Sequence, residues 1–95
     1  MSLTLRDAQY LSWKTIHKFG SAKEQILLDS TATILKKAQA IADELKNSGS
    51  SNKDSLGLLF SELLFSLFII AEQQGLNLEE SFLSAIDEII LNLVS

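Results

Sequence analysis

Residues 56–71, LGLLFSELLFSLFIIA, are the stretch that decides the fold. Apolar side chains occupy almost every position, so a helix formed here is apolar on nearly all sides. Each large apolar side chain left in water forgoes about 1.5–3 kcal/mol of burial free energy. We therefore expect this helix to lie at the centre of the fold, with the other segments packed around it.

A thin polar stripe interrupts this apolar helix. Its members are Ser55, Glu62, Ser66 and Gln73, which follow one another at spacings of seven, four and seven residues. Residues at these spacings lie along one side of a helix. An isolated buried carboxylate is costly, so Glu62 needs a partner or contact with water. The stripe fits either a binding site or a wet seam between helices.

The composition favours one small all-α domain spanning residues 1–95. The chain is 46% hydrophobic, contains no Pro, and has too few β-branched residues in continuous runs to form strands. The sequence contains no Cys, which excludes disulfides and thiolate metal sites and fits a cytoplasmic protein.

The charge distribution argues against two kinds of partner. The formal net charge is -4, and the basic residues all lie within the first 53 positions, without a clustered basic face of the kind that nucleic acids require. We therefore expect no nucleic-acid partner. Residues 56–71 are shorter than the roughly 20 residues that a bilayer requires, and they contain Glu62, so we also expect no membrane span.

Capping residues and glycines divide the chain into four predicted helices. Glycine stops are expected at Gly20 and Gly75, and residues 47–53, NSGSSNK, form a polar turn that lets the chain double back. The N-caps are expected at Thr4, at Ser21 (as a capping box with Glu24), at Asn52 or Asp54, and at Asn77.

The second predicted helix carries an apolar seam of alternating four- and three-residue steps. Such a seam predicts nearly parallel or antiparallel packing on another long helix. Glu44 is expected to turn away from the centre of this seam. The seam consists of Leu27, Thr31, Ile34, Ala38, Ile41 and Leu45.

The last predicted helix has two apolar stripes, which is more than one small monomer needs. A subunit interface is the simplest use for the second stripe, so we expect a homodimer or a homotetramer. The first stripe is Leu78, Phe82, Ile86, Ile89 and Leu93, and the second is Leu83, Ile90 and Val94.

Several segments together resemble the all-α nucleotide pyrophosphohydrolases, the superfamily of MazG-like proteins, dimeric dUTPases and phosphoribosyl-ATP pyrophosphohydrolase. The resemblance runs over residues 34–86, and its most specific part is residues 71–80, AEQQGLNLEE. The other segments are residues 34–37 (ILKK), 43–45 (DEL) and 62–65 (ELLF). The resemblance implies an oligomeric helical bundle that hydrolyses nucleotides between the α and β phosphates with magnesium held by acidic residues.

The acidic signature of that family is only partly present. Glu44 and Glu62 match acidic positions in chemical type, whereas Ile41 and Leu59 stand where the family has acids. The candidate magnesium ligands are therefore Glu44, Glu62 and Asp43, and no catalytic residue is assigned. The candidate nucleotide contacts are Lys36, Lys37 and Trp13.

These observations predict an all-α, four-helix chain with two long central helices, a MazG-like bundle completed by oligomerisation. The expected function is that of a catalytically degenerate MazG-like oligomeric scaffold, with weak binding of a nucleotide or partner. One alternative is an active pyrophosphohydrolase that uses magnesium in a rearranged acidic site. Another is a helical adaptor unrelated to nucleotides.

Overall fold

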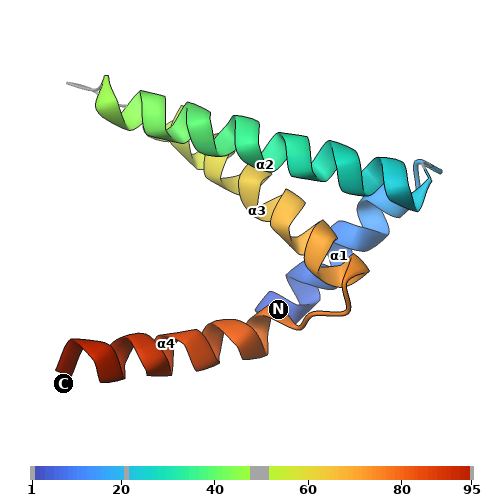
Figure 1. Cartoon of the computed structure of the whole chain (residues 1–95). Helices are drawn as coiled ribbons and strands as arrows, with labels where there is room; N and C mark the ends of the chain where they lie inside the picture. Colours follow the sequence, from blue (N-terminus) through green and yellow to red (C-terminus); the bar gives the residue numbers. More distant parts are fainter. Residues whose placement is uncertain (1, 21, 48–51, 95) are drawn as a thin grey trace.

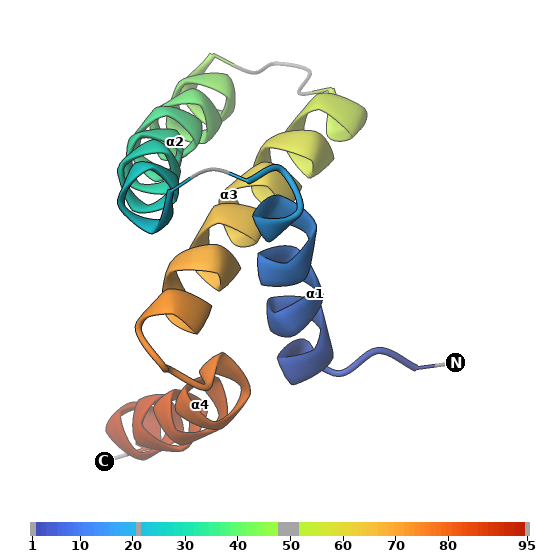
Figure 2. The ribbon, with the colours of Figure 1, turned by 90° about the vertical axis from the view of Figure 1, so that its right-hand side faces the viewer.

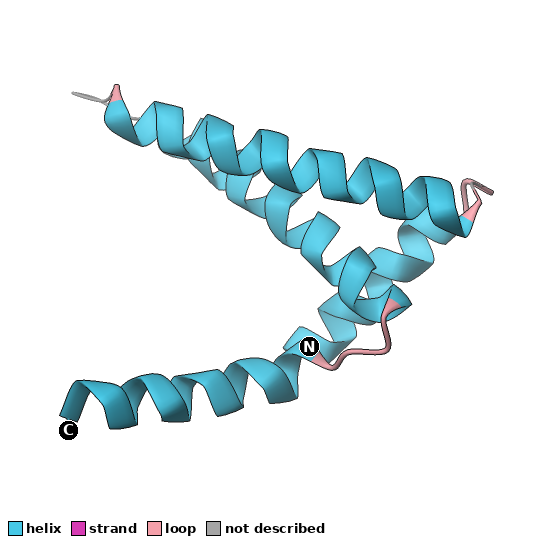
Figure 3. Ribbon diagram, in the orientation of Figure 1, coloured by secondary structure: helices cyan, strands magenta, loops and turns pink. Residues whose placement is uncertain are grey.

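The structure is a computed structural model that describes residues 2–20, 22–47 and 52–94. These residues form four helices: α1 (Leu5–His17), α2 (Lys23–Lys46), α3 (Lys53–Gln73) and α4 (Leu78–Val94). Figure 3 shows only helices and loops over these ranges, and no strand is assigned within them. The all-α, four-helix prediction is confirmed.

The helix starts follow the predicted capping chemistry at three of the four helices. Thr4 and Asp7 form a reciprocal capping box at α1. The Asn52 side chain accepts hydrogen bonds from the first backbone N–H groups of α3, and the Asn77 side chain accepts one from the Glu80 N–H. The start of α2 differs, because its N-cap is Ala22, which has no capping side chain. The predicted N-cap Ser21 lies outside the described residues.

The end of α3 is fixed by a glycine. Gly75 has a φ of 71°, in the left-handed region that favours glycine. The Leu76 N–H donates to the Ala71 carbonyl at 2.9 Å and the Gly75 N–H donates to the Glu72 carbonyl at 3.2 Å. This pair of bonds is a Schellman motif, and it turns the chain sharply from α3 into α4.

The prediction that the other segments pack around α3 is confirmed for α1 and α2 but not for α4. Both α2 and α1 pack on α3, and Figure 2 shows them on different sides of it. The C-terminal half of α3 supplies most of the core, whereas α4 projects away from the other helices and leaves an open angle in Figure 1. The buried apolar residues are Ile26, Ile41, Phe68, Ile69 and Ala71.

The side of α2 that faces α3 overlaps the predicted seam only in part, since Ile41 belongs to both. Ile26, Ser30 and Ile41 are buried in α2, whereas Thr31 and Leu45 of the predicted seam are exposed. The buried side is therefore rotated around the helix toward a more polar strip. The physical reason is that α3 presents its own polar stripe to α2, so the two helices meet through polar groups as well as apolar ones.

By length and composition, α3 is long and apolar enough to cross a membrane, which the shorter stretch 56–71 did not predict. The core helix of a soluble protein can have the same properties. Here only 22% of the apolar window is buried within the described chain, so the expected absence of a membrane span stays a prediction.

Candidate functional site

The polar stripe of α3 faces α2 along the length of both helices. Near one end, the Ser55 hydroxyl donates to Glu44 Oε2 at 3.3 Å. In the middle, Lys37 Nζ lies 2.9 Å from Glu62 Oε2. Near the other end, Gln73 Nε2 donates to the Lys23 carbonyl at 3.1 Å. The stripe is thus a polar seam between two packed helices.

Ser66 is the one member of the stripe without a partner in the described part of the chain. It is 4% exposed and lines an open pocket of about 340 Å³ to which α1, α2 and α3 contribute. Ser30, across the pocket on α2, is 7% exposed. Among the described residues neither hydroxyl has a hydrogen-bond partner, but neither oxygen is buried from water, whereas Gln73 Oε1 of the same stripe is buried without a partner. The polar seam therefore lacks a hydrogen bond between α2 and α3 at the level of Ser30 and Ser66.

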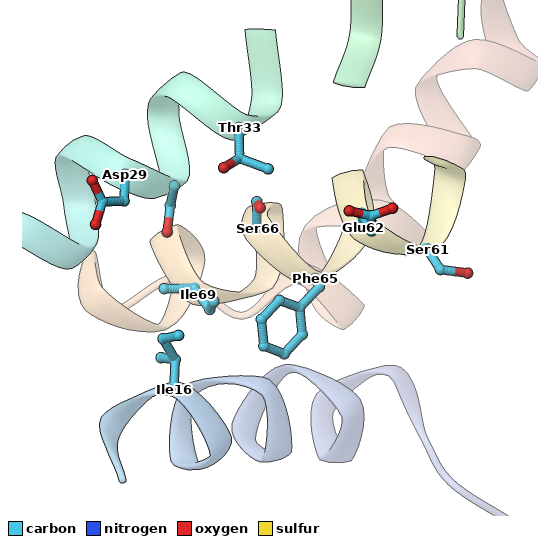
Figure 4. Close-up of a pocket in the computed structure, with 9 residues that line it drawn as sticks. Ile16, Asp29, Thr33, Ser61, Glu62, Phe65, Ser66 and Ile69 are labelled. Atoms are coloured by element: carbon cyan, nitrogen blue, oxygen red, sulfur yellow. The ribbon is translucent and has the colours of Figure 1, made fainter. Parts of the chain in front are cut away.

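Figure 4 shows how the pocket is lined. Asp29 lies near one end and Glu62 near the other, with Thr33 and Ser66 between them. Apolar side chains form the part of the wall between α3 and α1. These are Ile16, Phe65 and Ile69. The pocket therefore combines an apolar wall with hydroxyl groups and carboxylates.

The structure gives the three candidate magnesium ligands three different partners. Glu62 pairs with Lys37, Glu44 accepts the hydrogen bond from Ser55, and Asp43 accepts one from Gln39 at 2.8 Å. Among the described residues, no three His, Cys, Asp or Glu side chains form a group that could hold a metal ion. The magnesium site stays a prediction, and it needs carboxylates that these residues of one chain do not bring together.

Glu44 is turned away from the centre of the predicted seam, as expected, and the error lay in expecting the whole seam to pack on the neighbouring helix. Its carboxylate lies on the side of α2 that faces α3, where Ser55 reaches it. The error follows from the rotation of the buried side of α2, which carries Glu44 and Lys37 toward α3 together.

The candidate nucleotide contacts do not converge on one place. Lys37 is engaged with Glu62, and Lys36 is exposed on the neighbouring part of α2. Trp13 lies on α1 and stacks on His17, with ring centroids 5.4 Å apart. The two aromatic rings thus support each other at a surface of α1.

Gln9 is a buried polar residue that the sequence analysis missed. It is 0% exposed, and its side chain ties α1 to the junction between α3 and α4. Its amide nitrogen donates to the Leu76 carbonyl at 2.6 Å and to Glu72 Oε1 at 3.0 Å, and its oxygen accepts from the Leu78 N–H at 3.0 Å. The available signal was its spacing from Leu5, which places a polar side chain on the apolar face of α1.

An ion pair extends this junction. Arg6 Nη1 lies 2.6 Å from Glu72 Oε1. The hydrogen bond from Arg6 lowers the pKa of Glu72 below its ordinary value, opposed by burial of the carboxyl and assisted by Gln9 and the charge of Arg6. The same bond raises the pKa of Arg6. The carboxylate of Glu72 is therefore held in its charged form at the α3–α4 junction.

Acid should weaken this junction. Because the folded-state pKa of Glu72 is lowered from 4.5, its stabilisation is present above that value and is lost as the pH falls through the folded-state pKa. Between about pH 7 and about pH 3, the free energy of unfolding should fall by roughly 1 kcal/mol less in Glu72→Gln than in the wild type. Urea unfolding at both pH values and one protein concentration measures this. Glu88→Gln, on the exposed part of α4, is the matched control. Equal acid sensitivity of Glu72→Gln and wild type would contradict the role of Glu72.

The apolar surface of α4 is mostly uncovered in the described chain. No residue of α4 is buried, and its large apolar side chains are 36% exposed at Ile86 and 79% exposed at Leu93. Two hydrogen bonds tie the first turn of α4 to α1 in the described part of the chain: the Leu78 N–H donates to Gln9, and the Arg6 N–H donates to Glu79 at 3.4 Å.

Comparison with protein-family models, curated proteins and solved structures found no match to this chain. The likeness to the MazG-like proteins therefore rests on the sequence segments alone and stays a prediction.

Proposed function

We propose that this protein is a self-associating helical scaffold of MazG-like type in which the acidic site has degenerated, and that α4 is its main interface element. The observation that carries the proposal is the exposure of both apolar stripes of α4, in which every member except the partly buried Leu78 is exposed in the described chain. Each large apolar side chain gains about 1.5–3 kcal/mol on burial. A second copy of the chain is the partner that buries both stripes reciprocally.

The exposed area supports this choice of partner. The accessible surface of the chain is 7041 Å², whereas a compact monomer of 10.5 kDa has about 5,400 Å². The excess, roughly 1,600 Å², exceeds the roughly 800 Å² that each partner buries in a standard interface. The radius of gyration, 15.5 Å, is likewise larger than the roughly 12.4 Å of a compact domain of this length. An area of this size suits a stable homo-oligomer.

The place for the second copy is the open angle between α3 and α4. A cavity of about 480 Å³ lies there, lined largely by apolar side chains of both helices. Leu64 and Leu67 of α3 and Phe82 of α4 line it while remaining exposed. Phe60 extends the same surface along α3. Helices from a second copy placed in this angle would cover α3 and α4 at once.

Sedimentation equilibrium over a wide concentration range tests the proposal. We expect a mass at least twice the 10.5 kDa of the chain, maintained on dilution to low micromolar concentration. A monomer at every concentration would refute the scaffold.

The polar seam supports a degenerate site over a working one. Magnesium catalysis on a diphosphate needs several converging carboxylates. Lys37 lies opposite Glu62, and its ammonium group neutralises that carboxylate at 2.9 Å. One turn away on α3, Leu59 stands where the family has an acid. A helical adaptor unrelated to nucleotides would contain the same polar seam. It would differ from the degenerate enzyme because nucleotides would not change its unfolding midpoint.

Thermal unfolding with magnesium and a panel of nucleoside triphosphates distinguishes these functions. A ligand that binds the native state raises the midpoint, and weak nucleotide binding by a degenerate site predicts an increase of a few degrees at millimolar nucleotide without hydrolysis. No increase with any nucleotide would favour the adaptor. Turnover that Glu62→Gln or Glu44→Gln abolishes would instead establish the active enzyme.

A further inference from the structure

The open angle between α3 and α4 has two apolar walls (Figure 1). On α3, Phe60, Leu64 and Leu67 lie along one side of the helix, and all three are exposed in the described chain. On α4, Phe82 lines the cavity of this angle together with Leu64 and Leu67, and Ile89 continues the first stripe beyond it. A segment that fills the angle therefore needs two apolar sides.

The helix α4 itself has two apolar sides. Ile89 of the first stripe and Ile90 of the second are consecutive residues, so the two stripes point about 100° apart around the helix. Both side chains are exposed. Beyond the first turn, the acidic residues Asp87 and Glu88 lie outside the apolar arc that the stripes span. A neighbour can therefore cover α4 from two directions without burying these charges.

The other helices suit the angle less well. The two most exposed leucines of α2, Leu28 and Leu35, lie two turns apart on one side, so α2 offers one apolar side only. The exposed part of α1 includes Lys14 and Lys18, whose ammonium groups would be costly to place against an apolar wall. The helix α3 is already covered by α1 and α2. The match in shape and charge therefore selects α4 of a second copy.

The first stripe of α4 is complementary to itself in an antiparallel pair. Phe82, Ile86, Ile89 and Leu93 follow one another in steps of four, three and four residues, a pattern that is symmetric about its midpoint. A two-fold rotation places Ile86 of one copy opposite Ile89 of the other, in the spacing of a coiled-coil seam. Pairing through the first stripe leaves the second stripe free to contact α3.

We propose that two copies interlock, with α4 of each copy inserted into the α3–α4 angle of the other. The first stripes of the two α4 helices pair with each other, and the second stripe of each packs on the Phe60, Leu64 and Leu67 wall of the other copy. This inference rests on the proposed self-association and names the segment that fills the angle. The surplus surface of the chain exceeds what each partner buries in a standard interface.

Introduced cysteines test this arrangement, because the sequence contains none of its own. Leu64→Cys and an isotope-labelled Ile90→Cys, both at exposed positions, are mixed, equilibrated and oxidised under native conditions. We expect mass spectrometry to show at least about fivefold more mixed disulfide than the control mixture of Leu64→Cys with Leu35→Cys, because a disulfide forms only between neighbouring side chains. Leu35 is exposed on α2.

The cross-linking and the mass of the chain separate the two proposals. Equal yields from the two mixtures, or more disulfide with Leu35→Cys, would overturn the interlocked arrangement. If the unmodified chain is still an oligomer in sedimentation equilibrium, that result leaves the self-association standing. A monomer would refute both.

Phe60→Asp provides a second readout that needs no cross-link. Phe60 is exposed in its own chain, so the monomer should keep its helices, whereas the dissociation constant should rise roughly 20-fold or more. Leu35→Asp, the matched control on α2, should change it less than about threefold. An unchanged dissociation constant in Phe60→Asp would overturn the packing of α4 on the α3 wall.

Discussion

Ile89→Asp is expected to dissociate the protein into monomers, with at least a 100-fold increase in the dissociation constant. Ile89 lies in the middle of the first apolar stripe of α4 and is 55% exposed in the single chain. Burying an aspartate there would forgo about 1.5–3 kcal/mol of apolar burial and leave an unpaired charge in an apolar interface. In a symmetric interface the substitution occurs in both copies, which increases the effect. Sedimentation equilibrium measures the change.

Ser84→Asp is the matched control for this variant. It adds the same charge to α4, but on the side opposite the apolar stripes, and should leave the mass unchanged. Because Ile89 is not buried within its own chain, far-UV circular dichroism should show the helix content of the monomer retained. Similar masses for Ile89→Asp and Ser84→Asp would contradict the role of α4.

Gln9→Leu is expected to lower the stability of the protein by roughly 2–4 kcal/mol. The leucine side chain has a volume similar to that of glutamine, but it makes none of the three hydrogen bonds of Gln9. The Leu76 carbonyl and the Leu78 N–H then lose their partner at a partly buried junction, at a cost of about 1–3 kcal/mol each, partly offset by the new apolar side chain. Thermal unfolding at fixed protein concentration should show a decrease of roughly 10–20 °C in the midpoint.

Gln39→Leu is the control for Gln9→Leu. Gln39 is exposed on α2 and makes one hydrogen bond, to Asp43, so its replacement should change stability by less than about 0.5 kcal/mol. Faster hydrogen exchange at the Leu78 amide in Gln9→Leu alone would locate the damage at the α3–α4 junction. Equal midpoints for the two variants would contradict the locking role of Gln9.

The sequence predicted the members of the polar stripe but not their surroundings. Heptad-like spacing alone places Ser55 and Glu62 on one side of α3. Which helix that side faces depends on the docking of α2, and the docking put Lys37 rather than a carboxylate opposite Glu62. The candidate metal ligands were chosen by chemical type and motif, which do not report which atoms meet across two helices.

The seam of α2 was mispredicted for a related reason. Its apolar residues occupy a broad arc, and α3 covers only one side of it. Leu28 and Leu35 are left 65% and 70% exposed, whereas polar Ser30 is buried. Apolar periodicity identifies an amphipathic helix, but a helix with excess apolar surface has more than one side that can be buried.

By itself, the sequence determined the all-α class, the caps at Thr4 and Asn52, the glycine stop at Gly75 and the apolar stripes of α4. Each of these depends on groups within a few residues of one another along the chain. Only the tertiary structure decided that the polar stripe of α3 is a seam with α2, that Gln9 locks the α3–α4 junction, and that α4 projects uncovered. These features depend on which helix sides meet, and that choice is made by packing between residues far apart in sequence.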